Sequence, residues 1–329
     1  MATERAAIGA VGAGRMGRGI ALAFAYAGRA VTLIDTKPRE ADALASLEAD
    51  ARAEIARDLA LLAKADVIAD ADIAGIMALI GFAGKDDAAA ALAACDLLFE
   101  GVPETLAAKA DCFAFISTHA RPDCIIASTT STIDADTLAP LVTGPERFLN
   151  AHWLNPAHLM PLVEISPSKH TDPEVIARMR ALLTAIGKLP VVCKASPGYI
   201  VPRIQALAMN EAARMVEEGV ASAEDIDTAV RVGFGLRFAV LGLLEFIDWG
   251  GGDILHHASA FLSQTLDPRR FAAPAIIGEN MANGRRGLRD GAGFYDYADT
   301  DVTAYRDARM TDFITLLRQR DLMPRRGDA

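Results

Sequence analysis

"AAIGAVGAGRMGRGIALAFAYAGRAVTLID", residues 6–35, is the stretch that decides the fold of the first part of this chain. The apolar run from Ala6 to Val11 predicts a short buried strand, and a glycine-rich turn follows it. A helical pattern then runs to about Tyr26, and a second strand is expected from Ala30 to Ile34. The stretch therefore predicts a strand–turn–helix–strand unit, the start of an alternating α/β fold.

The turn contains the sequence G-x-G-x-x-G, formed by Gly12, Gly14 and Gly17. The first glycine allows the tight turn, the second lets the backbone approach a pyrophosphate, and the third lets helix and strand pack closely. The phosphates would face the unpaired N–H groups at the helix start. We assign Met16, inside the turn, to the same dinucleotide site. The alternative is a glycine-rich turn that binds no ligand.

Asp35 ends the second predicted strand and indicates which dinucleotide binds. A carboxylate there can accept hydrogen bonds from the adenosine ribose hydroxyls and would repel a 2′-phosphate. The expected cofactor is therefore NAD rather than NADP. Lys37 and Arg39, which follow closely, keep this choice open.

Strand-like runs and helical stretches alternate along the next part of the chain. Helical patterns cover Arg39 to Ala94, Leu106 to His119 and Pro173 to Gly187. Alternation of this kind predicts an α/β fold with a Rossmann-like, doubly wound sheet. The expected strands lie at 96–102, 124–129, 148–154, 162–166 and 189–193, with a weaker candidate in "LIGFAG" (79–84).

After "KASPGYIVP" (194–202) the pattern predicts helices only. Ser222, with Asp225 three residues later, predicts a helix N-terminus with a capping box. We therefore expect an NAD-binding domain over residues 1–195 and an all-α C-terminal domain over 196–329. Further helices are expected near 251–264, 270–283 and 301–320.

Composition restricts the partners and the compartment. The formal net charge of −10 argues against binding to nucleic acid or acidic membranes, which needs a basic face. The four cysteines form no CxxC pair and are expected to be small buried hydrophobes in a reducing, cytoplasmic compartment. We expect no metal site, no signal peptide and no membrane span.

"AHWLNPAHLMPLVEIS" (151–166) carries the candidate chemistry. His152 ends one predicted strand and Glu164 lies in the next, so neighbouring strands can bring the two side chains together. Histidine suits proton removal from an alcohol near neutral pH, and a carboxylate can orient it. Ser131 follows another strand and is expected in the same crevice. Each residue alone could be structural, as we expect for His158, His256 and His257.

The chain resembles the L-3-hydroxyacyl-CoA dehydrogenase family along nearly its whole length. The resemblance rests on "STTST" (128–132), "HWLNP" (152–156), "LVEI" (162–165), "CKASPGYIVPR" (193–203) and "GAGFYDY" (291–297). It implies a Rossmann-like domain followed by a helical domain through which two copies form a homodimer. It also implies NAD-dependent oxidation of a 3-hydroxyacyl-CoA, such as 3-hydroxybutyryl-CoA, in fatty acid metabolism.

The resemblance also assigns roles to single residues. His152 would be the catalytic base and Glu164 its partner, while Ser131 and Asn155 would bind the reacting oxygen and the histidine. The positions that would line the nicotinamide ribose are Glu104 and Lys109.

Several positions depart from the family pattern. Pro202 replaces an asparagine, although proline is tolerated in the first turn of a helix. Residues 36–100 hold six Lys or Arg against thirteen Asp or Glu, so no basic cluster awaits the phosphates of coenzyme A.

These departures favour the superfamily branches that oxidise free hydroxy acids or small hydroxy or formyl carboxylates, among them the gulonate, carnitine and pyridine-carboxylate dehydrogenases. Arg237 could pair with such a carboxylate, or be structural. A rival of another class is a non-catalytic, crystallin-like NAD-binding protein.

Overall fold

The computed structural model describes residues 6–324 and divides into two compact units. The first unit ends at Met209 and the second begins at Asn210. The division falls inside helix α8 (Val201–Glu217), whereas the sequence analysis expects a boundary between residues 195 and 196. The N-terminal unit is Rossmann-like and the C-terminal unit is helical, as predicted.

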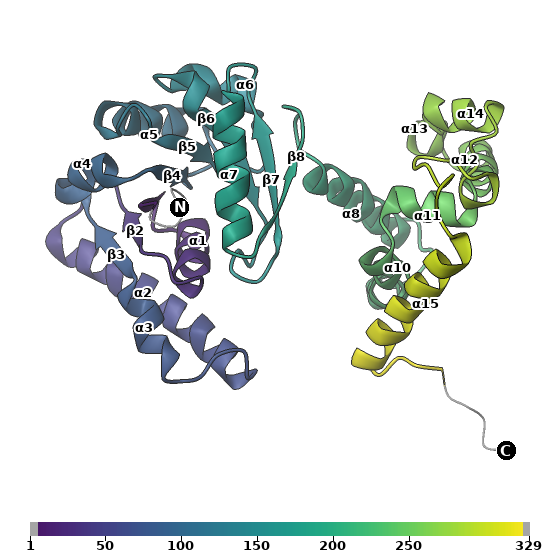
Figure 1. Ribbon diagram of the computed structural model, residues 1–329, viewed down its shortest axis with the longest axis horizontal. Coiled ribbons are helices and arrows are strands. Elements are labelled where there is room, and N and C mark those ends of the chain that lie inside the picture. The colour runs from purple at the N-terminus through teal and green to yellow at the C-terminus, as the bar shows by residue number, and fades with distance from the viewer. Residues whose placement is uncertain (1–5, 325–329) are drawn as a thin grey trace. The chain divides into compact units, whose positions relative to one another are not determined.

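Within the described residues, the first unit contains an eight-stranded sheet with the order β3-β2-β1-β4-β5-β6-β7-β8 (Figure 1). Neighbouring strands are parallel except β6 and β7, which are antiparallel. Every predicted strand is present, including the weaker candidate in "LIGFAG". The strands are β1 (Ile8–Val11), β2 (Val31–Ile34), β3 (Ile80–Ala83), β4 (Leu97–Glu100), β5 (Ile125–Ser128), β6 (Phe148–Trp153), β7 (Leu162–Pro167) and β8 (Leu189–Val192).

Helices connect the parallel strands of this sheet. The predicted helix 106–119 is α5 (Leu106–His119), whereas the helical stretch expected over residues 39–94 is three separate helices, and the short helix after β5 was not predicted. The others are α1 (Arg15–Tyr26), α2 (Ala41–Lys64), α3 (Asp72–Ala78), α4 (Lys85–Ala94), α6 (Ala135–Leu138) and α7 (Pro173–Ala185), with short 3₁₀ turns η2 (Ala139–Leu141) and η3 (Pro145–Arg147).

The β1–α1 turn shows why glycine is needed there. Gly12 has φ +104°, a conformation that residues with a Cβ rarely adopt. A Cβ on Gly17 would lie 2.0 Å from the carbonyl oxygen of Gly12, so the helix could not pack as closely. A Cβ on Gly14 would meet no atom within 4 Å. Space above Gly14 is therefore left open, and packing within the protein does not require this glycine.

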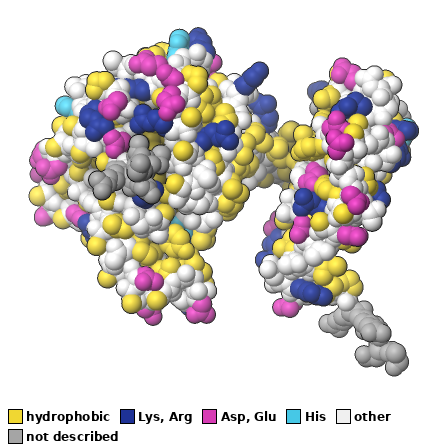
Figure 2. All heavy atoms as spheres, in the orientation of Figure 1, with side chains coloured by type: hydrophobic (Ala, Val, Ile, Leu, Met, Phe, Trp, Pro, Cys, Tyr) yellow, Lys and Arg dark blue, Asp and Glu magenta, His cyan; other side chains and the backbone are white. Residues whose placement is uncertain are grey.

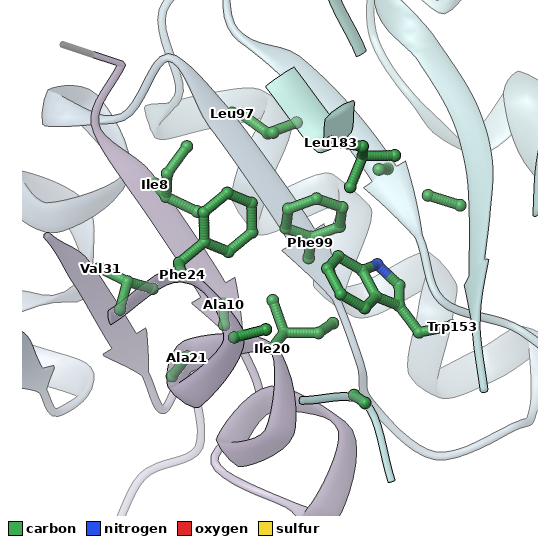
Figure 3. Packing of buried hydrophobic residues seen from close by; sticks show 14 of the residues in the cluster. Ile8, Ala10, Ile20, Ala21, Phe24, Val31, Leu97, Phe99, Trp153 and Leu183 are labelled. Atoms are coloured by element: carbon green, nitrogen blue, oxygen red, sulfur yellow. The ribbon is translucent and has the colours of Figure 1, made fainter. Parts of the chain in front are cut away.

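An aromatic cluster packs α1 against the sheet. The ring centroids of Phe24 and Phe99 are 5.7 Å apart, and those of Phe99 and Trp153 are 5.6 Å apart, edge to face (Figure 3). Trp153 is 2% exposed. Because side chains alternate along a strand, Trp153 enters this core while its neighbour His152 points to the opposite face of the sheet. One strand thus serves the core and the candidate site.

The described part of the second unit is helical. Ser222 caps the helix α9 (Ala223–Ala229), since its Oγ accepts a hydrogen bond from the amide of Asp225, which confirms the predicted start. The prediction of one helix over 270–283 is wrong. Pro274 has no N–H and favours an extended residue before it, so the helix breaks there. The helices after α8 are α9 (Ala223–Ala229), α10 (Gly235–Val240), α11 (Leu243–Gly250), α12 (Gly252–Thr265), α13 (Pro268–Phe271), α14 (Ala275–Ala282) and α15 (Val302–Gln319), with the π-helical segment η4 (Val230–Phe234) and the 3₁₀ turn η5 (Leu288–Asp290).

The cysteines follow the sequence expectation with one exception. Cys95, Cys112 and Cys124 are buried, whereas Cys193 is half-buried because it follows the short, largely exposed strand β8. Burial raises the pKa of the Cys95 thiol to about 11. Such a thiol stays protonated at neutral pH and behaves as an apolar side chain. In the part of the chain that is described, no helix combines the length and apolar character needed to cross a membrane.

The Gly17 contact gives a stability prediction. Gly17→Ala should lower the free energy of unfolding by about 1–3 kcal/mol, because the added methyl meets the Gly12 carbonyl and α1 must shift. Gly75→Ala, in α3, is the control, since its methyl meets no atom within 4 Å. Alanine should stabilise that helix by up to about 1 kcal/mol. Urea denaturation followed by circular dichroism measures both; equal stability of the Gly17 variant and the parent would contradict the packing role.

Candidate active site

The pairing of β6 with β7 builds the centre of the site. His152 lies directly opposite Glu164 in the antiparallel register. The His152 Nδ1 and the Glu164 Oε2 are 2.8 Å apart, and both side chains are buried. The register therefore brings together the two residues that the sequence analysis pairs.

The second carboxylate oxygen of Glu164 is also bonded. Oε1 accepts hydrogen bonds of 2.9 Å from the backbone amides of Ile200 and Val201, at the start of α8. Burial alone would raise the pKa of Glu164. The hydrogen bonds from His152 and from the two amides outweigh it, so this pKa is lowered. Glu164 is therefore ionised at neutral pH.

Ionised Glu164 decides which nitrogen of His152 carries the proton. A carboxylate can only accept, so Nδ1 must donate to it. In the neutral imidazole the lone pair is then on Nε2, the nitrogen on the far side of the ring. Nε2 is the atom free to accept a proton from a substrate.

Tyr199 covers one face of the His152 ring, a contact that the sequence analysis does not predict. The two rings are stacked, with centroids 5.0 Å apart and planes 7° apart. Tyr199 has φ +43°, and the preceding Gly198 has φ +74°, so two successive left-handed residues turn the chain back over the dyad. The only sequence signal was a glycine before an aromatic residue.

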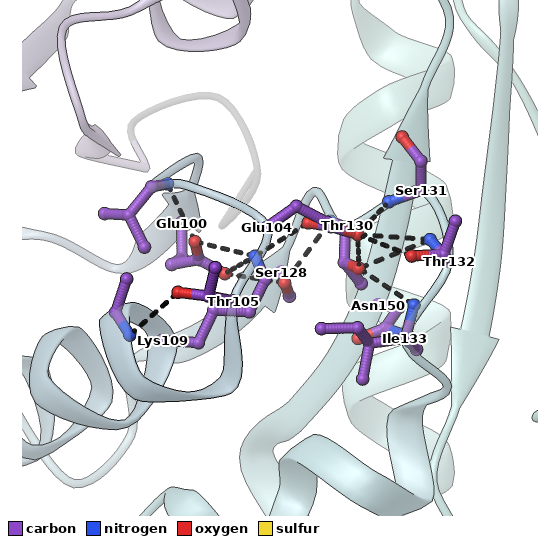
Figure 4. A network of polar contacts seen from close by, with 12 residues as sticks. Glu100, Glu104, Thr105, Lys109, Ser128, Thr130, Ser131, Thr132, Ile133 and Asn150 are labelled. Carbon is purple, nitrogen blue, oxygen red and sulfur yellow. Dashed lines mark hydrogen bonds and ion pairs between the residues drawn. The ribbon is translucent and has the colours of Figure 1, made fainter.

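The loop that follows β5 is held from one side by Glu104. The Glu104 carboxylate accepts hydrogen bonds from the amides of Ser131 and Thr132, at 3.0 and 3.2 Å, and from the hydroxyls of Thr130 and Thr132 (Figure 4). Burial would raise the pKa of Glu104, but the Thr130 hydrogen bond and the charge of Lys109 lower it overall. Glu104 thus fixes the loop that carries Ser131.

The same loop is held from the other side through its carbonyl groups. The Tyr199 hydroxyl donates to the Thr130 carbonyl at 2.9 Å and accepts from the Asn150 amide at 2.9 Å. Asn150 also donates to the Ile133 carbonyl at 2.9 Å. The Ser131 hydroxyl takes part in none of these bonds and points away from Glu104 (Figure 4). The loop is bonded at both ends, and this hydroxyl remains available.

Lys109 lies behind Glu104 in a buried ion-pair network. Its ammonium is 3.0 Å from both oxygens of Glu100 and 3.3 Å from Glu104. The Lys109 side chain is 1% exposed, so any effect of it on a ligand passes through Glu104. Ser128 donates to Glu100 at 2.6 Å. Glu100, a carboxylate inside an apolar strand, is a site-supporting residue that the sequence analysis does not single out.

Asn155 lies in the turn after β6 and is exposed. No hydrogen bond joins it to His152 within the described residues; it lines a pocket of about 190 Å³ with Arg15, Glu54 and Asp58. The turn is anchored by Lys188, whose buried ammonium donates to three carbonyls of residues 157–160, the shortest bond being 2.7 Å to Ala157. Lys188 is a second supporting residue that the sequence analysis does not identify.

The G-x-G-x-x-G turn opens on a pocket of about 450 Å³ at the carboxyl ends of β1, β2 and β4. The lining includes Gly12, Gly14, Met16 and Asp35. Gly14 caps α1 without a side-chain acceptor, and the first helical turn has no acidic residue. Open space at Gly14 and free amides at a helix start fit a pyrophosphate. Asp35 is buried and forms an ion pair with Arg39.

Two further sequence hypotheses can be placed in the structure. Pro202 is the second residue of α8, where a missing N–H is tolerated, as expected. The Arg237 guanidinium lies 5.7 Å from the centre of the Phe246 ring, which favours the structural interpretation of this arginine. Over residues 6–324 no group of His, Cys, Asp and Glu could hold a metal ion.

A Rossmann-like unit, a dinucleotide turn and a His–Glu pair at one sheet edge define the class of NAD-dependent oxidoreductases. The chain matches 3-hydroxyacyl-CoA dehydrogenase, NAD binding domain, over residues 7–196, and 3-hydroxyacyl-CoA dehydrogenase, C-terminal domain, over residues 198–297. It belongs to the 3-hydroxyacyl-CoA dehydrogenase family of oxidoreductases, which act on CH–OH groups with NAD.

Its relatives act on different substrates. The 5-formyl-3-hydroxy-2-methylpyridine 4-carboxylate 5-dehydrogenase of Mesorhizobium japonicum is 33% identical over 94% of this chain and 97% of its own length. The 3-hydroxybutyryl-CoA dehydrogenase of Bradyrhizobium diazoefficiens is 32% identical over 88% and 94%. The crystal structure of a 3-hydroxyacyl-CoA dehydrogenase from Archaeoglobus fulgidus is similar with a TM-score of 0.76 at 31% identity, covering 97% of this chain and 100% of that one.

The lowered pKa of Glu164 predicts how its contribution to stability depends on pH. A carboxyl group with a depressed pKa in the folded state stabilises the fold above its ordinary pKa of 4.5, and the contribution is lost as pH falls through the lowered value. At pH 5, Glu164→Gln should be less stable than the parent by about 1–3 kcal/mol. The difference should shrink as the pH falls from 4.5 towards 3. Urea titrations at these pH values measure it, and a constant difference would contradict a depressed pKa.

Proposed function

We propose that this chain oxidises the 3-hydroxyl group of a 3-hydroxyacyl-CoA to the keto form, with His152 as the general base. The buried His152–Glu164 pair, with every oxygen of Glu164 bonded, is the observation that carries this proposal. Bound NAD would take the hydride from the carbinol carbon. Nε2 of His152 would take the hydroxyl proton, and the neighbouring carboxylate would stabilise the imidazolium that results.

Ser131 and Asn155 would position the reacting oxygen. The fixed loop at residues 130–133 presents the Ser131 hydroxyl without a hydrogen-bond partner among residues 6–324, which suits a donor to an alcohol or carbonyl oxygen. The role of Asn155 rests on the family resemblance, because the side chain is exposed. We assign it to the substrate rather than to orientation of His152.

The cofactor site would comprise the glycine turn, Met16 and Asp35. Gly12, Gly14 and Gly17 bring the backbone to the pyrophosphate, and Asp35 would accept hydrogen bonds from the adenosine ribose. Arg39 holds the Asp35 carboxylate in place.

At the nicotinamide end, Glu104 would face the ribose. Lys109 would act through Glu104 because it is buried behind it.

The charges near the turn after β6, which holds Asn155, favour a second substrate class, the free carboxylic acids. Glu54, which pairs with Arg18, and Asp58 line the pocket at Asn155 together with Arg15, and residues 36–100 carry an excess of acidic side chains. The several phosphate charges of coenzyme A would be repelled more strongly there than a single carboxylate. The pyridine-carboxylate relative, similar over 94% of this chain, supports the same alternative: a free hydroxy acid or small hydroxy or formyl carboxylate.

We also propose that two copies associate through the helical unit, in the cytoplasm. Figure 2 shows hydrophobic side chains gathered over β8 and α8. Helix α8, which continues from the first unit into the second, has no buried residue: Leu207 and Met209, at the end of the first unit, are 70% and 68% exposed, and Val216, in the second unit, is 46% exposed. On α12, Ile254 and Phe261 are similarly exposed and lie two turns apart on one face. An apolar surface of this kind is typical of subunit interfaces.

His152→Gln tests the catalytic role. Removing the base should lower kcat by about two to four orders of magnitude, while NADH binding stays unchanged because the glycine turn is intact. Stopped-flow NADH absorbance measures turnover, and fluorescence titration measures NADH binding. His158→Gln, in the turn, is the control and should retain turnover. Undiminished turnover in the His152 variant would exclude this residue as the base. The non-catalytic alternative would be favoured only if the parent protein bound NADH but showed no turnover with any hydroxy acid tested.

A substrate panel separates the two substrate classes. We expect 3-hydroxybutyryl-CoA to support NADH formation. The kcat/KM for free 3-hydroxybutyrate should be at least about tenfold lower than the kcat/KM for the CoA ester, a ratio that corresponds to about 1.4 kcal/mol. The reverse ranking, or activity only with hydroxy or formyl pyridine carboxylates, would assign the chain to the free-acid class.

A further inference from the structure

We propose that Tyr199 is a positioning residue that couples the general base to the Ser131 loop. The inference rests on the proposed function, because it assumes that His152 and Ser131 act on one substrate. Tyr199 contacts the imidazole with its ring and the loop with its hydroxyl, so one side chain fixes both groups relative to each other.

The Tyr199 ring restricts a rotation of the His152 imidazole that the hydrogen bond to Glu164 still allows. The hydrogen bond from Nδ1 to Glu164 fixes one edge of the imidazole, but the ring can still tilt about that bond. Parallel stacking of Tyr199 at 5.0 Å sets the plane of the ring. Together the two contacts determine where Nε2 points, which controls proton transfer because distance and direction both matter.

The hydroxyl of Tyr199 fixes the loop that carries Ser131, the second residue proposed to contact the substrate. Tyr199 donates to the carbonyl of Thr130, and through Asn150 it is linked to the carbonyl of Ile133. These carbonyls lie on either side of Ser131. Since Glu104 already binds the amides of the loop, the backbone cannot rotate without breaking bonds on one side or the other. The Ser131 hydroxyl therefore keeps one position relative to His152.

The backbone at Tyr199 serves the same arrangement. The two left-handed residues, Gly198 and Tyr199, turn the chain so that the Tyr199 ring lies on the imidazole. The next two amides, of Ile200 and Val201, then reach Glu164. A left-handed non-glycine residue persists only where its surroundings fix it, and such residues gather at functional sites. Three consecutive residues thus hold the imidazole and the carboxylate.

The test is a kinetic double-mutant cycle of Tyr199→Phe and Ser131→Ala. Phenylalanine keeps the stacked ring and removes the two hydroxyl bonds. We expect kcat to fall about 3- to 10-fold in the parent, the effect of losing one or two hydrogen bonds. In the Ser131→Ala background the same change should cost less than about twofold, because the positioned hydroxyl is already gone. A purely structural tyrosine would lower kcat by the same factor in both backgrounds.

Two more variants keep the test decisive. Tyr199→Leu also removes the stack, and it should lower kcat further and change the pH profile of kcat, while NADH binding stays unchanged. Asn150→Ala removes the hydrogen bonds to the Ile133 carbonyl and the Tyr199 hydroxyl without altering the stacked ring. It serves as the replacement if Tyr199→Phe folds poorly, and its effect on kcat should also be non-additive with that of Ser131→Ala.

Tyr297→Phe is the matched control. Tyr297 is also buried, and its hydroxyl bonds Asp248 at 3.2 Å, so this variant should lose stability without the coupling to Ser131.

The outcomes separate this inference from the proposed function. Additive effects, or a Tyr199→Phe variant with parental kcat, would overturn the coupling while an inactive His152→Gln variant still supports the catalytic base. Full activity of Ser131→Ala would also overturn it. Undiminished turnover of His152→Gln would instead remove the proposed function itself.

Discussion

The structure of the site depends on the buried carboxylate of Glu164, because both of its oxygens must accept hydrogen bonds. Glu164 is 0% exposed, and an ionised carboxylate in such a place is tolerated only with strong donors. One donor comes from the adjacent strand, as His152. The others are main-chain amides at the start of α8, where unpaired N–H groups and the helix dipole favour negative charge. This requirement joins two strands and a helix, and it decides the tautomer of the imidazole.

The alternation of side chains along β6 makes the arrangement possible. His152 faces the site while Trp153, one residue further, fills the aromatic core under α1. A shift of β6 by one residue against β7 would place the polar side chain of His152 in that core and the Trp153 indole beside the substrate. The stability of the core therefore maintains the geometry of the chemistry. The same logic applies to Glu100, which ends β4 and anchors Lys109 behind the loop that presents Ser131.

Much of the fold could be predicted because its signals are local. The strands, the glycine turn and the cap at Ser222 follow from neighbouring residues, and the pairing of His152 with Glu164 follows from one short connection. The helix break at Pro274 was missed because the apolar period continues through it. Tyr199, Asn150 and Lys188 were missed for another reason: their partners lie 69, 49 and 31 residues away, and no local pattern reports such contacts. Asn155 is the opposite case: the motif identifies the position, but the described residues show no hydrogen bond from Asn155 to His152.

The entry of α8 into the site has a consequence for where the chain could be divided. The sequence change at residue 196 and the family match ending at residue 196 both suggest a cut before "PGYIVP". A fragment ending there would keep the glycine turn and both dyad strands. It would lose the Tyr199 ring that covers the imidazole and the two amides that donate hydrogen bonds to Glu164. Proton transfer therefore needs residues on both sides of residue 196. Exchanging helical domains between relatives at this point would keep His152 and replace the residues that hold it and Glu164 in place.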